Sequence, residues 1–423
     1  MKDRKTNRCR RVVVTGMGVI SPVGNDVPTF WKNILGGVCG IDYIKSIPTD
    51  DLPVKIAGEV KNFCPADYEI EPAFARKQDN FTTYAVAAAW QAMKQSGLVA
   101  AADGNIDPYR LGVYIGSGIG GFATQVHENE KVFREGPKWV SPLFIPTMIA
   151  NIAAGNVAIR HNACGPCLPV VTACATSTHA IGEAYRAIKH GYADAIIAGG
   201  SEASILPIGI AGFANARALS KAENPQYASL PFNKKRAGFV MAEGAAALIL
   251  EEYDHAVARG ATIFAEVCGY GNTCDAHHVT APRPDGQTQA AAIRMALEEA
   301  DYTAADTLYI NAHGTGTPLN DTTETKAFKI ALGEEQAHKA HISSTKGATG
   351  HMLGAAGAAE ALAAVMALHD GMVPPTINLD EVDDECDLDY TPNTPVKADL
   401  TIAISDSLGF GGHNGCVAFR KLA

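Results

Sequence analysis

The chain has 423 residues, 47% of them hydrophobic and 19% charged, which is enough apolar material for a large globular core. Its 35 basic and 45 acidic residues give a net charge of −10, which argues against nucleic acid as a general partner. The ten irregularly spaced cysteines favour a reducing compartment, the basic start MKDRKTNRCRR lacks the apolar run of a signal peptide, and no segment is long enough to span a membrane. We therefore expect a cytoplasmic protein.

Short apolar runs bounded by turn residues predict ten strands, at 11–16, 111–117, 168–173, 194–200, 246–252, 262–271, 307–312, 341–345, 401–407 and 415–421. Apolar residues at helical spacing predict helices between many of them, at 80–96, 147–161, 175–190, 287–300, 320–332 and 354–370. This alternation predicts an α/β protein with parallel sheets that are covered on both faces.

Five predicted strands precede residue 260 and five follow it, so we expect two similar halves, 1–260 and 261–423, in one two-lobed body. The stretch 118–146 is rich in Gly and Pro and poor in periodicity. We interpret it as a long insertion or a partner-binding loop.

The stretch HNACGPCLPVVTACATSTHAIGEAYRAIKHG, residues 161–191, contains three cysteines that differ in their surroundings. Cys174 falls between a predicted strand and a predicted helix, where free N–H groups and the helix dipole stabilise a thiolate. Thr176, Ser177 and Thr178 offer oxygens for capping that helix. Cys174 is therefore the candidate nucleophile, against the commoner fate of an isolated cysteine as a small core residue.

The pair Cys164 and Cys167 permits two other interpretations. A Cys-x-x-Cys pair forms a redox dithiol when its first thiol starts a helix, whereas this pair precedes a strand. A zinc set of both cysteines with Cys174 and His179 has almost the right ligands, but no second Cys-x-x-Cys follows. We therefore expect no metal.

Two histidines follow predicted strands in Gly-rich loops. His313 lies in NAHGTGTPLND, and His351 lies with Lys346 in SSTKGATGHMLGAAG. Ligands of α/β sheets bind at the carboxyl ends of strands, so Cys174 and both histidines are expected to meet there. The string of Gly116, Gly118 and Gly121 imitates a dinucleotide fingerprint, but no strand ending in Asp or Glu follows at the required distance.

Four segments together carry a resemblance: TACATSTHAIG, NAHGTGTPLND, SSTKGATGHMLGAAG and LGFGGHNG. They are similar to the signatures of the elongating β-ketoacyl-[acyl carrier protein] synthases of the synthase II type. RVVVTGMGVISPVG, ARALS and PFNKKRAGFVMAEGA also match, so the resemblance spans nearly the whole chain. It implies the thiolase fold, in which two similar five-stranded α/β halves form a layered αβαβα core, and a homodimer.

The resemblance also implies roles for the candidate residues. Cys174 would accept the acyl group, and His313 and His351 would act in decarboxylation. Lys346 would organise the site together with Glu360 on the following helix.

Further residues are implied to handle the substrate. Phe410 would be the gate, and its N–H and that of Cys174 would form the oxyanion hole. Thr315 and Thr317 would bind the pantetheine arm, and Ile119 would form the wall that limits acyl chain length.

The implied activity is that of an acyltransferase, which extends fatty acids by two carbons through decarboxylative Claisen condensation of a malonyl group with a Cys-bound acyl chain. Neutral imidazoles that donate N–H bonds can stabilise the enolate that decarboxylation produces. The expected partner is acyl carrier protein, which brings the acyl and malonyl groups on its own phosphopantetheine arm, and no other cofactor is expected.

Three alternatives stay open from the sequence. A biosynthetic thiolase would need a second cysteine as acid and base, for which Cys416 is the sole candidate, although it falls in a predicted strand. A polyketide-type ketosynthase would share the chemistry, and a non-catalytic subunit would lack the nucleophile. Asp406 and Leu408 stand where the family commonly has Asn and Phe, which leaves loop dynamics and chain-length preference open.

Overall fold

The computed structural model describes residues 10–422, so most of the basic N-terminal stretch lies outside the described residues. The central sheet is built from β1 (Val12–Ile20), β4 (Leu111–Gly116), β5 (Ala195–Glu202), β6 (Gly244–Glu252), β7 (Ala265–Cys274), β8 (Leu308–Asn311), β9 (His341–Ser343), β12 (Ile402–Gly409) and β13 (His413–Arg420). Two small two-stranded sheets pair β2 (Asp42–Tyr43) with β3 (Ile56–Ala57) and β10 (Met372–Val373) with β11 (Val396–Lys397). Nine of the ten predicted strands are therefore confirmed.

The remaining predicted strand, 168–173, does not form a regular strand. Its beginning pairs with β4 through a parallel bridge between Val113 and Cys167, and the Leu168 N–H donates to the Val113 carbonyl at 3.0 Å. Pro169 then removes a backbone donor, which ends regular pairing. This segment is the open edge of the sheet, beside β4.

The strand order shows that the chain contains the same arrangement twice. The sheet runs β4-β5-β6-β1-β7-β13-β12-β8-β9. Counted from the outer edge, the first half reads Cys167 segment, β4, β5, β6, β1, and the second reads β9, β8, β12, β13, β7. In both halves this is the third, second, fourth, fifth and first strand in chain order, so the two five-membered units share one topology.

The expectation of parallel sheets is confirmed for some strand pairs and wrong for the others. The pairs β4–β5, β8–β9 and β8–β12 are parallel, whereas β5–β6, β1–β6, β12–β13 and β7–β13 are antiparallel. Parallel neighbours need a long crossover, but only Phe410–Gly412 separates β12 from β13, and so short a turn forces an antiparallel pair.

The helices fill the remaining layers. Their bounds are α1 (Val27–Leu35), α2 (Pro72–Ala75), α3 (Asn80–Ser96), α4 (Phe122–Glu135), α5 (Phe144–Met148), α6 (Ile152–Arg160), α7 (Thr176–Lys189), α8 (Pro207–Asn215), α9 (Tyr253–Ala258), α10 (Gln287–Glu299), α11 (Pro318–Leu332), α12 (Glu334–Lys339), α13 (Lys346–Thr349) and α14 (Ala356–Asp370). The six predicted helices are present, although α6 begins later than predicted, because Ile149 is extended (ψ of 138°) and separates α5 from α6.

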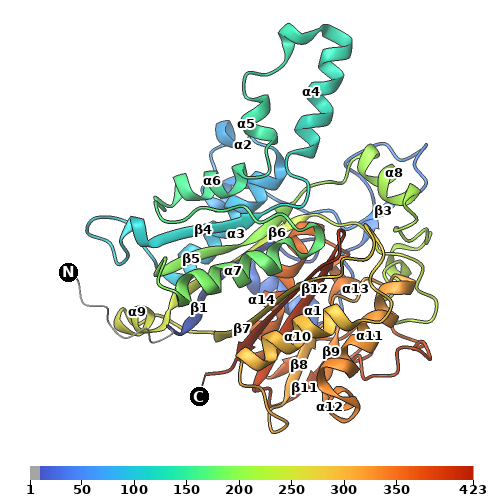
Figure 1. The fold of residues 1–423 in the computed structure, drawn as a ribbon. Helices are drawn as coiled ribbons and strands as arrows, with labels where there is room; N and C mark the ends of the chain where they lie inside the picture. Colours follow the sequence, from blue (N-terminus) through green and yellow to red (C-terminus); the bar gives the residue numbers. More distant parts are fainter. Residues whose placement is uncertain (1–9, 423) are drawn as a thin grey trace.

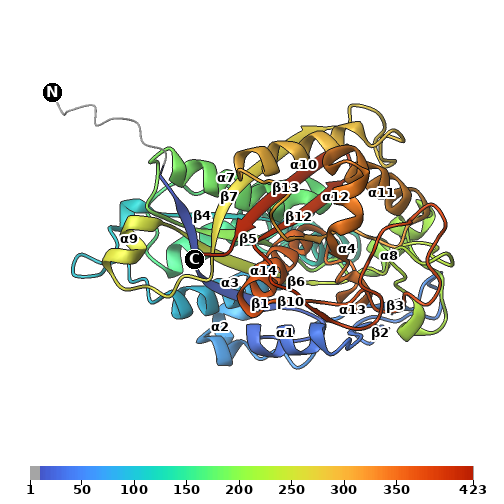
Figure 2. The ribbon, with the colours of Figure 1, turned by 90° about the horizontal axis from the view of Figure 1, so that it is seen from below.

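Helices α7 and α14 form the middle layer, because each contacts strands of both halves. Helix α14 is buried on nearly every side, which explains why its sequence is apolar all round. Helices α3 and α6 cover the outer face of the first half, and α10, with α11 beside it, covers that of the second (Figures 1 and 2). The result is the five-layered αβαβα arrangement of the thiolase fold.

The two β layers are joined into one continuous sheet where the halves meet. There β1 pairs with β6 along its length and with β7 of the second half at Val12–Val14. One core cluster also combines residues of both halves, such as Ile181 from α7 and Leu362 from α14. The division into domains at residue 260 stays a prediction.

The stretch 118–146 is not a loop but a helical arm. It contains α4, a short 3-10 turn at Pro137–Trp139 and α5, and it extends away from the body of the molecule (Figure 1). Gly136 and Pro137 end α4, and Glu128 is the one residue that α4 buries, so the sequence of this helix lacks the apolar stripe of a core helix. Within residues 10–422, no helix combines the length and the apolar character needed to cross a bilayer.

Candidate active site

A cavity of about 350 Å³ opens where the two halves meet, at the ends of their strands. Cys174, His313 and His351 line it, together with Phe410 and both predicted arm-binding threonines, Thr315 and Thr317. The structure therefore brings together six of the residues singled out in the sequence.

Cys174 sits in a tight turn directly before α7. The turn is the 3-10 helix Ala173–Ala175, and Ala173 has a φ of +52°, a conformation that costs an alanine free energy. The predicted capping by Thr176 is wrong, because α7 has no side-chain cap, and the Thr176 hydroxyl instead accepts the Thr172 N–H at 2.9 Å. That bond holds the strained turn which presents Cys174.

The Cys174 thiol is protonated in the resting protein. Burial raises its pKa to about 12, and the positive charge of Lys346 and a hydrogen bond from the Phe410 N–H act in the opposite direction. The effect of burial on the thiol pKa outweighs those of Lys346 and the Phe410 N–H. The proton must leave the sulfur as the acyl group arrives.

His313 and His351 face each other edge to face, with ring centroids 5.3 Å apart and planes at 85°. Both are buried, and burial together with the charge of Lys346 holds the pKa of each imidazole well below 6.5. Both rings are therefore neutral at pH 7, the state in which an imidazole donates one N–H and accepts at its other nitrogen.

Lys346 is buried behind the histidines and forms a close ion pair with Glu360 of α14. Its Nζ also lies 3.4 Å from Nδ1 of His313. An ammonium has only donors, so His313 accepts at Nδ1 and carries its proton on Nε2. This contact fixes the tautomer that can donate a hydrogen bond from Nε2.

The loop that carries His313 is held by two buried carboxylates of α11: Asp321, which ends the motif NAHGTGTPLND, and Glu324, which the sequence did not single out. Glu324 accepts the N–H groups of His313 at 2.6 Å and Gly314 at 2.8 Å. Asp321 accepts the N–H groups of Phe232 at 2.7 Å and Gly316 at 3.2 Å. The sequence did contain a signal for these carboxylates, because acidic residues occur in the helix that directly follows the Gly-rich loop.

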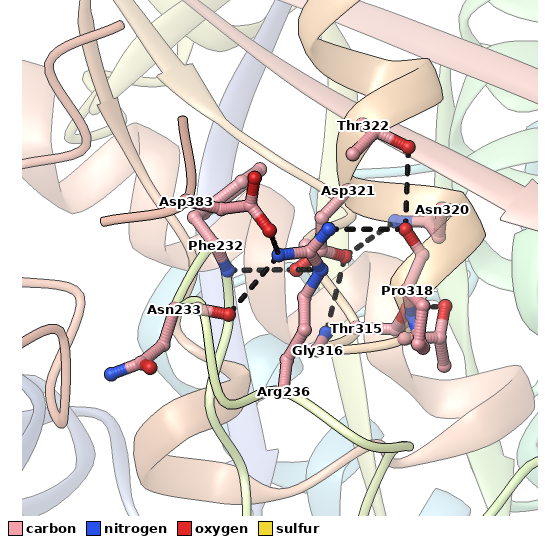
Figure 3. A network of polar contacts seen from close by, with 12 residues as sticks. Phe232, Asn233, Arg236, Thr315, Gly316, Pro318, Asn320, Asp321, Thr322 and Asp383 are labelled. Carbon is pink, nitrogen blue, oxygen red and sulfur yellow. Dashed lines mark hydrogen bonds and ion pairs between the residues drawn. The ribbon is translucent and has the colours of Figure 1, made fainter. Parts of the chain in front are cut away.

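Buried Arg236 joins this loop to the neighbouring segment 232–236 (Figure 3). Its guanidinium donates to Asp383 at 2.6 Å and to the Pro318 carbonyl at 3.2 Å. Next to it, the hydroxyls of Thr315 and Thr317 lie 3.0 Å apart at the cavity wall. The network holds the arm-binding candidates on a rigid support.

Phe410 begins the turn between β12 and β13, and its ring lies 6.3 Å from that of Phe213. Gly411 and Gly412 follow with φ of +92° and +79°, conformations that glycine adopts without strain. A Cβ at Gly409 would lie 2.4 Å from the Thr172 carbonyl, so the glycine lets this strand pass directly against the Cys174 turn.

Ile119 lies apart from the other candidates. It is 40% exposed and does not line the cavity. Its N–H donates to buried Glu202 at 3.2 Å, another carboxylate that sequence reasoning missed.

The alternative cysteine sites lie elsewhere. Cys164 and Cys167 are exposed free thiols, and His179 uses both ring nitrogens within the protein, with Thr172 at 2.8 Å and the Asn414 carbonyl at 3.2 Å. Residues 10–422 bring no three metal-ligating side chains together. Cys416 is buried in the core of the second half and does not line the cavity. It therefore cannot serve there as the second cysteine that a thiolase needs.

The two departures from the family pattern lie near the gate. Asp406 is buried, accepts from the Gln289 amide at 2.8 Å, and has its pKa raised to about 7 by burial. Leu408 lines the cavity. The second departure therefore touches the space that a substrate would occupy.

The chain matches the family model described as "Beta-ketoacyl synthase, N-terminal domain" over residues 9–256 and "Beta-ketoacyl synthase, C-terminal domain" over residues 264–380. The 3-oxoacyl-[acyl-carrier-protein] synthase 2 of Staphylococcus aureus (strain N315) is 48% identical over 412 residues, covering 97% of this chain and 98% of that protein. That of Vibrio harveyi is 46% identical, covering 98% and 99%.

A solved structure described as a type II PKS acyl-carrier protein in complex with its ketosynthase contains a chain that is 34% identical. It superimposes with a TM-score of 0.89 and covers 98% of this chain and 100% of that chain. A beta-ketoacyl synthase from Burkholderia phymatum STM815 superimposes equally well, with 33% identity over 98% of this chain. Fold, cavity and sequence therefore agree, and this chain belongs to the beta-ketoacyl synthase family.

Proposed function

We propose that the protein is a 3-oxoacyl-[acyl-carrier-protein] synthase, an acyltransferase that joins a malonyl group to a Cys174-bound acyl chain with loss of CO₂. The observation that carries the proposal is the cavity in which Cys174 meets two neutral imidazoles, one of them fixed by Lys346. These groups fit both half-reactions.

In the first half-reaction, Cys174 Sγ attacks the acyl thioester and a new C–S bond forms. The carrier thiol leaves and takes up the proton that the cysteine loses. The N–H groups of Cys174 and Phe410 stabilise the oxyanion, a role supported by the close approach of Gly409 to the Cys174 turn.

In the second, the C–C bond to the carboxylate of the malonyl group breaks, CO₂ leaves, and the electron pair remains as an enolate. The Nε2–H of His313 and an N–H of His351 stabilise the enolate oxygen. The carbanion attacks the acyl carbonyl, a C–C bond forms, and Cys174 leaves as the thiolate and regains a proton. Lys346 and Glu360 hold His313 in the donating tautomer.

Other residues of the site bind and select the substrate. Thr315 and Thr317 bind the pantetheine arm that enters on the acyl carrier protein, and Phe410 gates the passage to Cys174. Ile119 limits the length of the acyl chain; the support for this role is not the cavity, which Ile119 does not line, but the packing of its turn beside the nucleophile, where a Cβ on Gly118 would lie 3.6 Å from the Ala173 carbonyl.

The proposed assembly is a homodimer in the cytoplasm. The open sheet edge carries Leu168 at 52% and Val171 at 51% exposure, and Ile159 of α6 is 82% exposed nearby along the chain. An unpaired edge with exposed apolar side chains is suited to pairing with a second copy. All nine cysteines between residues 10 and 422 are free thiols, as a reducing compartment requires.

The test supplies the protein with malonyl-carrier and acyl-carriers of graded length and measures both the acyl adduct on Cys174 and the released product by mass spectrometry. We expect a Cys174 adduct and a product that is longer by two carbons. The absence of both would contradict the proposal.

The second candidate is a polyketide-type ketosynthase, because one chain of the type II PKS structure is 34% identical and superimposes with a TM-score of 0.89. The 48% identity to a 3-oxoacyl-[acyl-carrier-protein] synthase 2 favours the first candidate. In the same assay, without a ketoreductase, a fatty-acid enzyme adds one unit and stops at the 3-oxoacyl product. Repeated extension of unreduced chains would indicate a polyketide-type ketosynthase.

A further inference from the structure

Glu202, the last residue of β5, is a fully buried carboxylate that the reaction itself does not use. Five donors converge on it. One oxygen accepts from Ser117 Oγ at 2.9 Å, Ser204 Oγ at 3.2 Å and the Ile119 N–H at 3.2 Å. The other accepts the N–H groups of Gly118 at 2.9 Å and Gly354 at 3.1 Å.

These donors come from segments far apart in the chain. The turn 117–120 follows β4, and Gly354 lies between His351 and α14. Ser117 Oγ also accepts the Gly120 N–H at 2.9 Å, so the turn is closed on itself as well as on Glu202. Glu202 therefore ties the turn that carries Ile119 to the segment that follows His351.

The packing around the carboxylate leaves no room for a side chain at Gly118 or Gly354. A Cβ on Gly118 would lie 2.7 Å from the Glu202 oxygen, and one on Gly354 would lie 2.9 Å from it and 2.5 Å from the Gly118 nitrogen. The same Gly118 Cβ would be 3.6 Å from the carbonyl of Ala173, the residue before Cys174. Both glycines thus allow the backbone donors to reach Glu202, and the turn packs directly beside the nucleophile.

Glu202 also acts on the nucleophile electrostatically. Burial raises the pKa of Glu202, and the hydrogen bonds that it accepts lower this pKa and favour the charged carboxylate. That charge raises the pKa of the Cys174 thiol, as burial and Glu360 also do, in opposition to Lys346. A buried carboxylate costs free energy unless hydrogen-bond donors are supplied, and its five donors offset that cost for Glu202.

We propose that Glu202 is a positioning residue that holds the turn 117–120 beside Cys174 and thereby sets the longest acyl chain that the protein accepts. The chain-length part of this inference rests on the proposed function, in which Ile119 limits the acyl chain. The electrostatic part concerns Cys174 alone.

The test compares Glu202→Gln and Ser117→Ala with wild type. The glutamine keeps the shape, but its NH₂ group opposes incoming N–H donors. Ser117→Ala leaves the carboxylate and removes one of its donors, together with the acceptor of the Gly120 N–H. The matched control is Glu251→Gln, which alters a buried carboxylate of β6 that binds Thr15, His255 and Arg259 and does not line the cavity.

The first readout is the acylation rate of Cys174 by acyl-carriers of graded length. We expect the ratio of long-chain to short-chain rates to change roughly tenfold in Glu202→Gln and less in Ser117→Ala. Glu251→Gln should lower the melting temperature without changing the ratio. A wild-type ratio in both Glu202→Gln and Ser117→Ala would overturn the proposal, and Ser117→Ala decides the matter if the glutamine variant does not fold.

The second readout is alkylation of Cys174 by iodoacetamide at pH 7, resolved by peptide mass spectrometry because other cysteines are exposed. Loss of the negative charge should speed alkylation about threefold in Glu202→Gln and leave Glu251→Gln unchanged. If wild type accepts no acyl group, the proposed function fails, while this readout still decides whether Glu202 acts on Cys174. Equal rates in all variants would contradict that action.

Discussion

Lys346 and Glu360 form an ion pair that is buried on all sides, and the same ammonium lies 3.4 Å from Nδ1 of His313. The pair joins the loop after β9 to the central helix α14. One cation thus supports a packed core helix and the proton position of an imidazole in the cavity. Stability and chemistry are coupled at this point.

Lys346→Met should cost about 3–5 kcal/mol in the free energy of unfolding, because it leaves the Glu360 carboxylate buried and unpaired. The double variant with Glu360→Gln should recover much of that loss. Because Lys346 lowers the pKa of His313 and His351, both pKa values should rise in the single variant, which NMR of the ring nitrogens measures. Lys339→Met breaks the exposed pair with Glu335 and should cost at most about 1 kcal/mol. Equal costs at the two sites would argue against this account.

Cys174→Ser should abolish acyl transfer and leave the melting temperature nearly unchanged. The substitution is almost isosteric, but a serine hydroxyl in this turn keeps its proton at pH 7. Intact-mass measurement after incubation with acyl-carrier checks the result, with Cys164→Ser as a control at an exposed cysteine. An acyl group on Cys164 or Cys167 in the Cys174→Ser variant would show that the nucleophile is misassigned.

His313→Ala and His351→Ala should still acylate Cys174 but lose condensation by roughly 100- to 1,000-fold, about 3 kcal/mol of transition-state stabilisation each. Acyl adduct and product are measured separately. Both pKa values lie well below 6.5, so the wild-type condensation rate should show no histidine titration between pH 6 and 8. His338→Ala, in exposed α12, is the control. Near wild-type condensation in either cavity variant would make that histidine structural.

The acidic carrier protein should dock on a basic surface near the cavity mouth. The sequence offers Arg76, Lys77, Arg134, Lys138, Arg217 and Lys221, all exposed, and Arg217 lines the cavity. Reversing Arg217 and Lys221 to Glu should raise KM severalfold for carrier-bound substrate and leave KM for small thioesters unchanged. Lys397→Glu on β11, which does not line the cavity, is the control. Equal effects on both substrates would remove this surface from consideration.

Ile119→Phe should shorten the longest acyl chain accepted and leave short chains nearly unaffected, because each methylene group that is excluded loses about 0.8 kcal/mol. Elongation rates across graded acyl-carriers measure the effect. The side chain is 40% exposed in the single chain, so the added ring has room and the fold should survive. A uniform loss at every length would indicate damaged packing instead of a narrowed channel.

The sequence by itself determined the types of the elements and most of their limits. Local periodicity carries that information, and it is reliable where a segment such as α3 repeats its apolar residues over several turns. The sequence also indicated that Cys174, His313 and His351 would meet, because each was predicted to follow a strand of an α/β sheet, although the segment before Cys174 forms only an isolated bridge with β4. It failed at 118–146, where α4 extends away from the body and buries only Glu128 among its own residues, so no apolar stripe marks the helix.

Only the tertiary structure decided what depends on contacts between distant residues. The antiparallel strands, the absence of a side-chain cap on α7 and the carboxylates that hold the site all depend on such contacts. Glu202 accepts the N–H of Gly354, which lies 152 positions away in the chain, and neither residue type predicts that contact. A buried carboxylate is stabilised by donors that folding brings to it, and local sequence cannot show where those donors come from.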